Sequence, residues 1–422
     1  MRPRPAGTRF SPRDAERYLL GLELFGMRFG LDRMRRLMTV LGSPQERYAT
    51  IHVVGTNGKS STTRMLAAIL RRHGLRAGAY LSPHLVSFEE RVLVDGAEVS
   101  PQEFADAVAR AAGAAAMVDR TLAPGDRVTQ FEALTAAAYD ELARREVEVA
   151  VVEAGLGGRY DATNVIPSRV QVLTNVGLEH TRWLGPTIAD IAGEKLAVVR
   201  DGATLVVGAG LHPDALALAE EVADERGARL ILAPEDDPGA ELLARGAFQR
   251  RNFALARAAA GAFLGALDEA AVHAAAAGTL VPGRFQTIAT RPEVIVDGAH
   301  NAEGMAALAE ALRGTLDGRR LVAAVSILDD KDAAAMLRLL LPLCDEVVFC
   351  AASNPRALSP ATLESLARQL GGPPARIVGG ARQALAAARE AAGPDGVALA
   401  TGSLYLIADL LRPAGAGRGS TL

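Results

Sequence analysis

The chain has 422 residues, of which 49% are hydrophobic and 23% charged, with a formal net charge of −3. This length is typical of two globular domains, and the composition is that of an ordinary globular protein with a large core. The near-neutral charge excludes the strongly basic footprint of proteins that bind nucleic acid or acidic membrane surfaces, so we expect neither partner.

The N-terminal stretch MRPRPAGTRFSPRD lacks the apolar centre of a signal peptide, and no apolar run reaches the roughly 18–20 residues of a membrane span. The two cysteines, Cys344 and Cys350, lie in CDEVVFC, which reads as a strand. Within one strand they are too far apart for a disulfide, so buried free thiols in a reducing compartment are expected. The sequence predicts a soluble, cytoplasmic protein.

Short β-branched runs alternate with amphipathic helical stretches along the chain, as in α/β proteins with a mainly parallel sheet. Helices are predicted over 63–73 and 132–145, among others. The predicted strands are 50–55, 76–81, 147–155, 169–177, 203–210, 293–301, 320–326, 346–352 and 396–403.

A domain boundary is predicted near residue 283, where a helix ends at Gly278 and Pro282 and Gly283 interrupt the pattern. The expected domains are therefore 1–283 and 284–422. The final residues 412–422 are predicted to form a disordered tail.

The segment Gly55–Ser60 joins the first strand to a helix and contains two glycines followed by Lys59. It is two residues shorter than the usual phosphate-binding pattern. Its parts nevertheless suit a phosphate site: backbone amides at a helix N-terminus, a lysine, and hydroxyls at Ser60 and Ser61 for Mg²⁺. The alternative is a polar turn with a serine cap.

Polar residues follow several strands at the edge where an open parallel sheet binds ligands. Glu153, His180, Asp297 and His300 all fall there. A carboxylate and a histidine near a phosphate site suit a divalent ion. Alternatively, Glu153 caps a loop, His180 is a hydrogen-bonded loop residue, and Asp297 is a helix N-cap.

The order of several motifs resembles folylpolyglutamate synthases and dihydrofolate synthases of the Mur ligase superfamily. These motifs are VVGTNGKSST, LSPHLVSFEERV, TQFEALT, VVEAGLGGRYDATN, HTRWLGPTIADIAGEK, PGRFQ, DGAHN and DDKD. The ends of the chain, LLGLELFGMRFGLDRMRRLM and ATGSLYLIADLL, also resemble the ends of this family.

The resemblance implies a P-loop ATPase domain with a mainly parallel sheet and a smaller, Rossmann-like C-terminal domain. It also implies ATP-dependent addition of L-glutamate to the carboxylate of dihydropteroate or a folate through an acyl phosphate. A monomer is expected, and so is closure of one domain over ATP bound to the other, which would exclude water.

The resemblance further assigns roles to individual residues. Lys59, Lys195, His180, Arg284 and His300 would act in catalysis. Mg²⁺ would be held by Ser60 or Ser61 with Glu153, and a second ion by His180, with Lys195 carbamylated. ATP would contact Gly55, Thr56, Asn57, Gly58, Lys59, Ser60, Ser61, Asn252, Arg284, Asp297 and His300. From the sequence alone, without the resemblance, the expected interpretation of Lys195 is a solvated helix lysine paired with Glu194.

The matching substrate loops are Ser82, Pro83 and His84, and Gln130 with Phe131, whose ring either packs on the flat heterocycle or belongs to the core. Ser326 and Lys331 are the candidates for binding the incoming glutamate.

The sequence departs from the family at Ser60, which replaces a glycine, at Glu179, which replaces an aspartate, and at Leu196. Two other functions stay open: another Mur-superfamily ligase, or a P-loop kinase or nucleotide-binding regulator. Whether the first glutamate, later ones, or both are added is not determined by the sequence.

Overall fold

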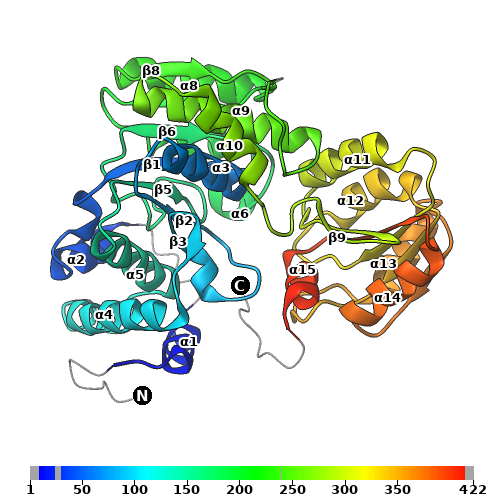
Figure 1. Ribbon diagram of the computed structural model, residues 1–422. Coiled ribbons are helices and arrows are strands. Elements are labelled where there is room, and N and C mark those ends of the chain that lie inside the picture. Colours follow the sequence, from blue (N-terminus) through cyan, green and yellow to red (C-terminus); the bar gives the residue numbers. More distant parts are fainter. Residues whose placement is uncertain (1–8, 24–29, 238, 414–422) are drawn as a thin grey trace. The chain divides into compact units, whose positions relative to one another are not determined.

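The computed structural model describes residues 9–23, 30–237 and 239–413 (Figure 1). The described residues divide into two compact units, one formed by 9–23, 30–237, 239–241 and 251–277 and the other by 242–250 and 278–413. The division therefore falls after Ala277, and a short earlier segment belongs with the second unit. A single domain boundary at residue 283 stays a prediction.

The first unit is built on an eight-stranded sheet with the strand order β4-β3-β2-β5-β1-β6-β7-β8. From β2 to β8 in this order all neighbours are parallel, whereas β3 and β4 are antiparallel at one edge. The strands are β1 (Ala49–Val54), β2 (Ala77–Tyr80), β3 (Val92–Val94), β4 (Ala97–Glu98), β5 (Val149–Glu153), β6 (Val170–Leu173), β7 (Thr204–Val207) and β8 (Arg229–Leu232).

Several helices of the first unit begin at a capping box, in which a serine or threonine and an acidic residue three positions later bond each other's backbone. The helices are α1 (Pro12–Leu20), α2 (Asp32–Val40), η1 (Pro44–Glu46), α3 (Lys59–Arg72), η2 (Phe88–Arg91), α4 (Pro101–Asp119), α5 (Gln130–Arg144), α6 (Thr181–Leu184), α7 (Ile188–Leu196), α8 (Pro213–Glu225), α9 (Ala247–Leu264) and α10 (Glu269–Gly278). The unit division falls inside α9.

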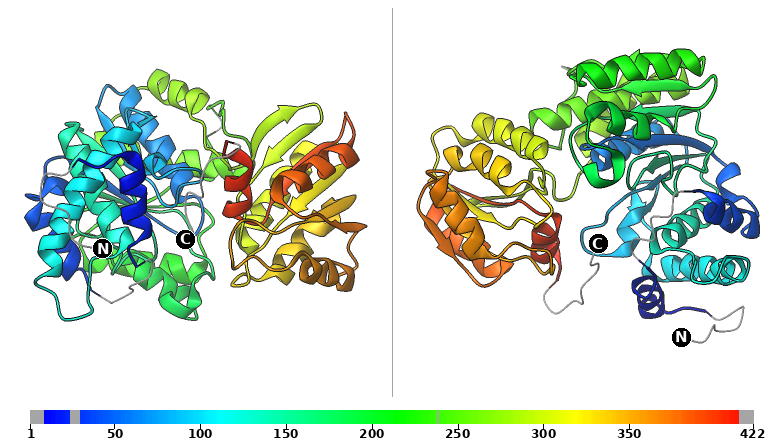
Figure 2. Two further views of the ribbon diagram at one scale, coloured as in Figure 1. Left: turned by 90° about the horizontal axis from the view of Figure 1, so that it is seen from below. Right: turned by 180° about the vertical axis from the view of Figure 1, so that it is seen from behind.

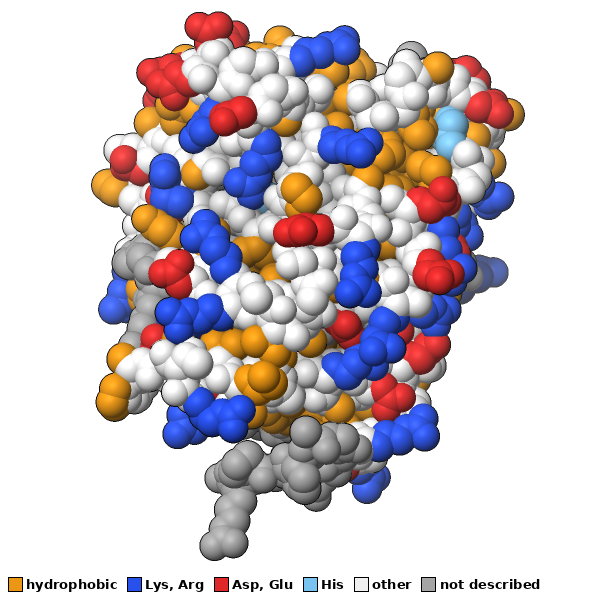
Figure 3. All heavy atoms as spheres, turned by 90° about the vertical axis from the view of Figure 1, so that its left-hand side faces the viewer, with side chains coloured by type: hydrophobic (Ala, Val, Ile, Leu, Met, Phe, Trp, Pro, Cys, Tyr) orange, Lys and Arg blue, Asp and Glu red, His pale blue; other side chains and the backbone are white. Residues whose placement is uncertain are grey.

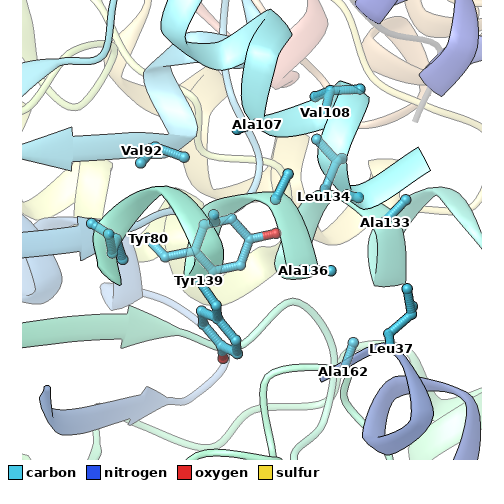
Figure 4. Close-up of a cluster of buried hydrophobic side chains, with 14 of the residues drawn as sticks. Leu37, Tyr80, Val92, Ala107, Val108, Ala133, Leu134, Ala136, Tyr139 and Ala162 are labelled. Atoms are coloured by element: carbon cyan, nitrogen blue, oxygen red, sulfur yellow. The ribbon is translucent and has the colours of Figure 1, made fainter. Parts of the chain in front are cut away.

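Small side chains let α4 and α5 approach closely, and two buried tyrosines fill the remaining space. Tyr80 of β2 and Tyr139 of α5 meet edge-on with ring centroids 6.2 Å apart. Around them lie alanines and aliphatic side chains, including Leu134 and Ala136 (Figure 4). The low aromatic content of the sequence is thus offset by close helix packing.

The second unit has a six-stranded sheet with the order β13-β12-β11-β14-β10-β9, parallel except for β9. Its α11 and α12 cover one face and α14 the other (Figure 2). The strands are β9 (Gln286–Thr290), β10 (Glu293–Val296), β11 (Leu321–Val325), β12 (Glu346–Phe349), β13 (Ala375–Ile377) and β14 (Val397–Thr401). The helices are α11 (Ala302–Leu316), α12 (Ala333–Leu340), η3 (Leu341–Leu343), α13 (Pro360–Gln369), α14 (Ala381–Ala392) and α15 (Leu404–Leu411).

The predicted two-domain α/β fold with mainly parallel sheets is confirmed, and all nine predicted strands are present. The helix predicted over 63–73 begins earlier, at Lys59. Five strands were not predicted: β3, β4, β8, β9 and β13. They are two to five residues long, and none of the residues of β4, β8, β9 and β13 is fully buried, so most of these strands lack a buried apolar run.

The cysteines flank β12 instead of sharing it, because the strand ends at Phe349. Both are free thiols, and burial raises the pKa of each to about 12. The predicted tail lies mostly outside the described residues, as do 1–8 and 24–29 of the N-terminal motifs.

No helix in the described part of the chain is long and apolar enough to cross a lipid bilayer. On the face drawn in Figure 3, basic and acidic side chains are interspersed with apolar ones. This mixture agrees with the near-neutral net charge of the sequence.

Candidate active site

The loop between β1 and α3 is a tight turn that only glycine permits at two positions. Gly55 has a φ of +152°, and a Cβ there would lie 1.8 Å from Thr174 Oγ1. Gly58, the N-cap of α3, has a φ of +81°, and a Cβ there would lie 2.5 Å from Asn252 Oδ1. The predicted residue Asn252 is therefore placed directly against the loop. The first amides of α3 have no partner within the helix, so they form a ready anion site.

Lys59 is the first residue of α3, and its side chain curls back over the loop. Its Nζ donates to Gly55 O and Thr56 O, both at 3.0 Å. The ammonium charge is thus held at the same end of the helix as the unpaired amides. An anionic group at this point would gain both the lysine charge and the positive end of the helix dipole.

Two amides of the loop are used inside the protein. Thr56 N donates to Asn175 O at 3.0 Å, and Asn57 N donates to Asn175 Oδ1 at 2.7 Å. Thr56 and Asn57, predicted to contact the nucleotide, therefore have these donors occupied by the segment that follows β6. This segment carried no motif that the sequence analysis assigned to the site.

Glu153 ends β5 beside the phosphate loop and is 1% exposed. Its Oε1 accepts a hydrogen bond from Ser60 Oγ at 2.9 Å, and its Oε2 accepts one from Ser82 N at 3.1 Å. Of the two candidate serines, Ser60 reaches this carboxylate, whereas Ser61 is buried within α3. The strand end thus gathers a carboxylate and two hydroxyl-bearing residues, which are oxygen ligands that Mg²⁺ prefers.

Lys195 of α7 is 4% exposed, and its Nζ donates to Gly55 O at 2.8 Å. The simple interpretation of a solvated lysine paired with Glu194 is wrong, because Glu194 instead pairs with Arg159 at 2.9 Å. A buried amine is therefore brought to the start of the phosphate loop, 140 residues away in sequence.

His180 precedes α6 with a left-handed backbone, at a φ of +53°. Its side chain is 42% exposed, and its Nε2 lies 4.0 Å from Glu179 Oε1. In residues 9–23, 30–237 and 239–413, no group of three or more His, Cys, Asp and Glu side chains is arranged to hold a metal ion. Any ion here needs further oxygens, from hydroxyls or from a bound phosphate.

The loop after β2 is held by Arg91, which is fully buried. Arg91 Nε donates to His84 Nδ1 at 2.9 Å, and its Nη1 donates to Ser82 Oγ at 3.3 Å. Burial lowers the pKa of Arg91. Ser82 and His84 are thus fixed in place while Pro83 is exposed. Arg91 is a positioning residue within the LSPHLVSFEERV motif, and the sequence alone predicted no role for it.

The second predicted substrate segment begins α5. Gln130 is buried, and its Nε2 donates to Leu19 O at 2.8 Å, so this amide ties α5 to the end of α1. Phe131 is only partly buried and packs against the core. Its ring stacks on Tyr80 and lies so close to Gly155 that a Cβ there would be 2.5 Å from the ring.

In the second unit, Asp297 and His300 follow β10, and Arg284, which precedes β9, lies beside this loop. Asp297 accepts from Phe285 N at 2.7 Å and from Ala299 N at 2.8 Å, and burial raises its pKa against the opposing charges of Arg284 and His300. A Cβ at Gly298 would lie 2.3 Å from Arg284 Nη1, so this glycine makes room for the guanidinium.

The N-cap of α11 is Asn301, whose Oδ1 accepts from Gly304 N. The alternative interpretation of Asp297 as a helix N-cap is therefore wrong. His300 Nδ1 lies 2.8 Å from Gly298 O, which places its proton on Nδ1.

The two residues predicted to bind the incoming glutamate, Ser326 and Lys331, differ in their surroundings. Ser326 is fully buried, and its Oγ accepts from Ala352 N at 3.0 Å. This hydrogen bond joins the segments that follow β11 and β12. Lys331 Nζ lies 3.4 Å from Asp330, whose other oxygen lies 3.6 Å from Arg356. Arg356 was missed by the sequence analysis, although it follows the strand segment 346–352 in a turn-forming SNPR sequence.

Comparison with known proteins identifies the family of the chain. The domain family "Mur ligase, glutamate ligase domain" matches residues 283–404. The dihydrofolate synthase/folylpolyglutamate synthase of Mycobacterium tuberculosis is 37% identical over 381 residues, covering 81% of this chain and 78% of that protein. The Escherichia coli protein of the same name is 32% identical over 410 residues, covering 93% of each. The chain belongs to the folylpolyglutamate synthase/dihydrofolate synthase family.

Solved structures of this family have the same fold over nearly the whole chain. The Mycobacterium tuberculosis folylpolyglutamate synthase complexed with ADP has a TM-score of 0.87 at 33% identity, covering 95% of this chain and 97% of that one. Escherichia coli FolC in complex with DHPP and ADP has a TM-score of 0.85 at 29% identity, covering 97% and 98%. As a member of this family, the protein is an ATP-dependent ligase of the folate synthase type.

Proposed function

We propose that the protein joins L-glutamate to the carboxylate of dihydropteroate or a reduced folate through an acyl phosphate. The observation that carries this proposal is the meeting of Lys59, Glu153 and Ser60 at the carboxyl ends of β1 and β5. The substrate carboxylate attacks the γ-phosphorus of ATP and ADP leaves. The neutral amine of glutamate then attacks the acyl carbon, phosphate leaves, and the amine loses a proton.

The residues beside the phosphate loop suit Mg²⁺. Glu153 would hold the ion with the hydroxyl of Ser60, while the backbone N–H of Ser82 donates to the other oxygen of the same carboxylate. Mg²⁺ is commonly bound by one or two carboxylates together with substrate phosphates, which matches a site with a single acid. When bound, the ion neutralises charge on the phosphates. Lys59 and the first amides of α3 bind and orient the phosphates.

His180 would hold a second ion only together with substrate oxygens, because the described residues supply no metal-binding group of three or more His, Cys, Asp and Glu side chains. Lys195 is proposed to be carbamylated: its neutral amine adds to CO₂ and one proton is released. The residue is 4% exposed, and its Nζ lies 2.8 Å from Gly55 O at the start of the phosphate loop.

Arg284, Asp297 and His300 are proposed to act on the nucleotide. Asp297 organises the loop by accepting two backbone amides, and Arg284 and His300 supply the polar groups around it. For glutamate, we propose Lys331 and Arg356, which flank Asp330. Two cations suit a ligand with two carboxylates.

The loops 82–84 and 130–131 are proposed to bind the pterin part of the acceptor, with the exposed part of the Phe131 ring against the flat heterocycle. A monomer is expected, and size-exclusion chromatography would check it.

Purified protein tests the function directly. It is given ATP, Mg²⁺ and glutamate with either dihydropteroate or a reduced folate, and products are read by mass. Phosphate release that requires both the pterin acid and glutamate supports the ligase. Phosphate release that ignores both supports the alternative of a nucleotide-binding regulator and overturns the proposal.

A further inference from the structure

The segment after β6 contacts the phosphate loop through several hydrogen bonds. β6 lies beside β1 in the sheet, and Thr174 N continues the ladder by donating to Val54 O at 2.9 Å (Figure 1). Thr174 and Asn175 therefore start at the level where the phosphate loop starts. We call these two residues the β6 clamp.

The β6 clamp bonds to both sides of the phosphate loop. Thr174 Oγ1 donates to Asn57 O at 2.6 Å, and Asn175 Oδ1 accepts from Asn57 N at 2.7 Å. Asn175 O also accepts from Thr56 N at 3.0 Å. One peptide segment of the loop is thus held through its carbonyl and through two consecutive amides.

The Thr174 side chain also occupies the space that Gly55 leaves. Its Oγ1 would be 1.8 Å from a Cβ at Gly55, so the hydroxyl and the glycine are matched. A further pair of bonds lies next to the β6 clamp: Gly177 N donates to Thr56 Oγ1 at 3.0 Å, and Thr56 Oγ1 lies 3.4 Å from Gly177 O. The loop is therefore fixed along its first three residues by protein contacts alone.

We propose that Thr174 and Asn175 are positioning residues that hold the phosphate loop in its nucleotide-binding shape before ATP arrives. This inference rests on the proposed nucleotide site and deepens it. Because the amides of Thr56 and Asn57 donate to the β6 clamp, the groups that bind the phosphates are the first amides of α3 and Lys59. A glycine loop without such bonds samples many conformations. The observed affinity for the nucleotide is then reduced in proportion to the fraction of molecules whose loop is in the binding conformation.

The test is the pair Thr174→Val and Thr174→Ser. Valine keeps the shape and removes the donor to Asn57 O, whereas serine keeps the hydroxyl. One lost hydrogen bond corresponds to roughly a two- to tenfold weaker affinity. For T174V we therefore expect the Kd of ADP, measured by calorimetry, and the KM of ATP to rise by this factor. The kcat at saturating ATP and the KM of the folate should stay unchanged. T174S is expected within about twofold of the wild type.

The chain offers a matched control. Thr50 lies on β1, is fully buried, and its Oγ1 has no hydrogen-bond partner among the described residues. Thr50→Val therefore removes a buried threonine hydroxyl from the same sheet and should leave ADP affinity unchanged. Asn175→Ala is the second variant, expected to raise the Kd of ADP at least as much as T174V, with far-UV circular dichroism confirming that each variant folds.

The outcomes separate the two proposals. A wild-type protein that does not bind ADP overturns the nucleotide site itself. A wild type that binds ADP, with T174V and N175A binding it equally well, overturns the β6 clamp alone. The inference is also overturned if T174V lowers kcat at unchanged ATP KM, or if T50V weakens ADP binding as much as T174V.

Discussion

His52 gives a stability prediction that can be worked out from its surroundings. It lies on β1, fully buried, with Nε2 2.8 Å from Thr163 Oγ1. Thr163 Oγ1 donates to Asp161, so His52 Nε2 carries the proton and donates to Thr163. His52 Nδ1 has no hydrogen-bond partner among the described residues. Protonating the ring would create a buried cation whose new N–H has no acceptor.

Burial, and then the charge of Arg200, lower the pKa of His52 from 6.5 to about 3. Between these two values the unfolded chain binds a proton that the folded protein does not, so stability falls as the pH falls. Each pH unit below 6.5 removes about 1.4 kcal/mol. Lowering the pH from 7.5 to 5 should therefore remove about 2 kcal/mol of unfolding free energy through His52 alone.

The comparison is between the wild type and His52→Gln, whose amide keeps a donor for Thr163 but does not titrate. Urea unfolding followed by far-UV circular dichroism at pH 7.5 and pH 5 gives the loss of stability for each. The wild type should lose about 2 kcal/mol more than H52Q. An equal loss in both proteins, or a His52 ring found protonated at pH 5 by NMR, would refute the reasoning.

Three further predictions concern the proposed site. Lys59→Ala should abolish phosphate release with the fold intact by circular dichroism, since it removes the charge at the phosphate loop; largely unchanged turnover contradicts the nucleotide assignment. Glu153→Gln keeps the size but removes the negative charge, so turnover should fall by roughly 100-fold and need more Mg²⁺; a wild-type Mg²⁺ activation curve counts against the ion site. His300→Ala should lower kcat roughly tenfold or more, and wild-type kinetics would remove His300 from the nucleotide site.

Much of the fold follows from the sequence because its signals are local. The nine predicted strands are buried apolar runs of the kind that parallel sheets require, so each could be recognised without its neighbours. The edge strands could not: β4, for example, is Ala97–Glu98, both exposed, and is defined only by pairing with β3. The start of α3 at Lys59 was also missed, since its cap is the backbone of Gly58 and not a serine side chain.

The candidate site divides in the same way. The sequence alone determined the glycine loop, the strand-end carboxylate Glu153 and the family, because each is a run of adjacent residues with its own chemistry. The tertiary structure alone decided that Ser60 and not Ser61 meets Glu153, that Lys195 is buried against Gly55, and that Thr174 and Asn175 hold the loop. These contacts join residues about 90 to 140 positions apart. The sheet order, which places β1 between β5 and β6, brings them together, and no local pattern encodes it.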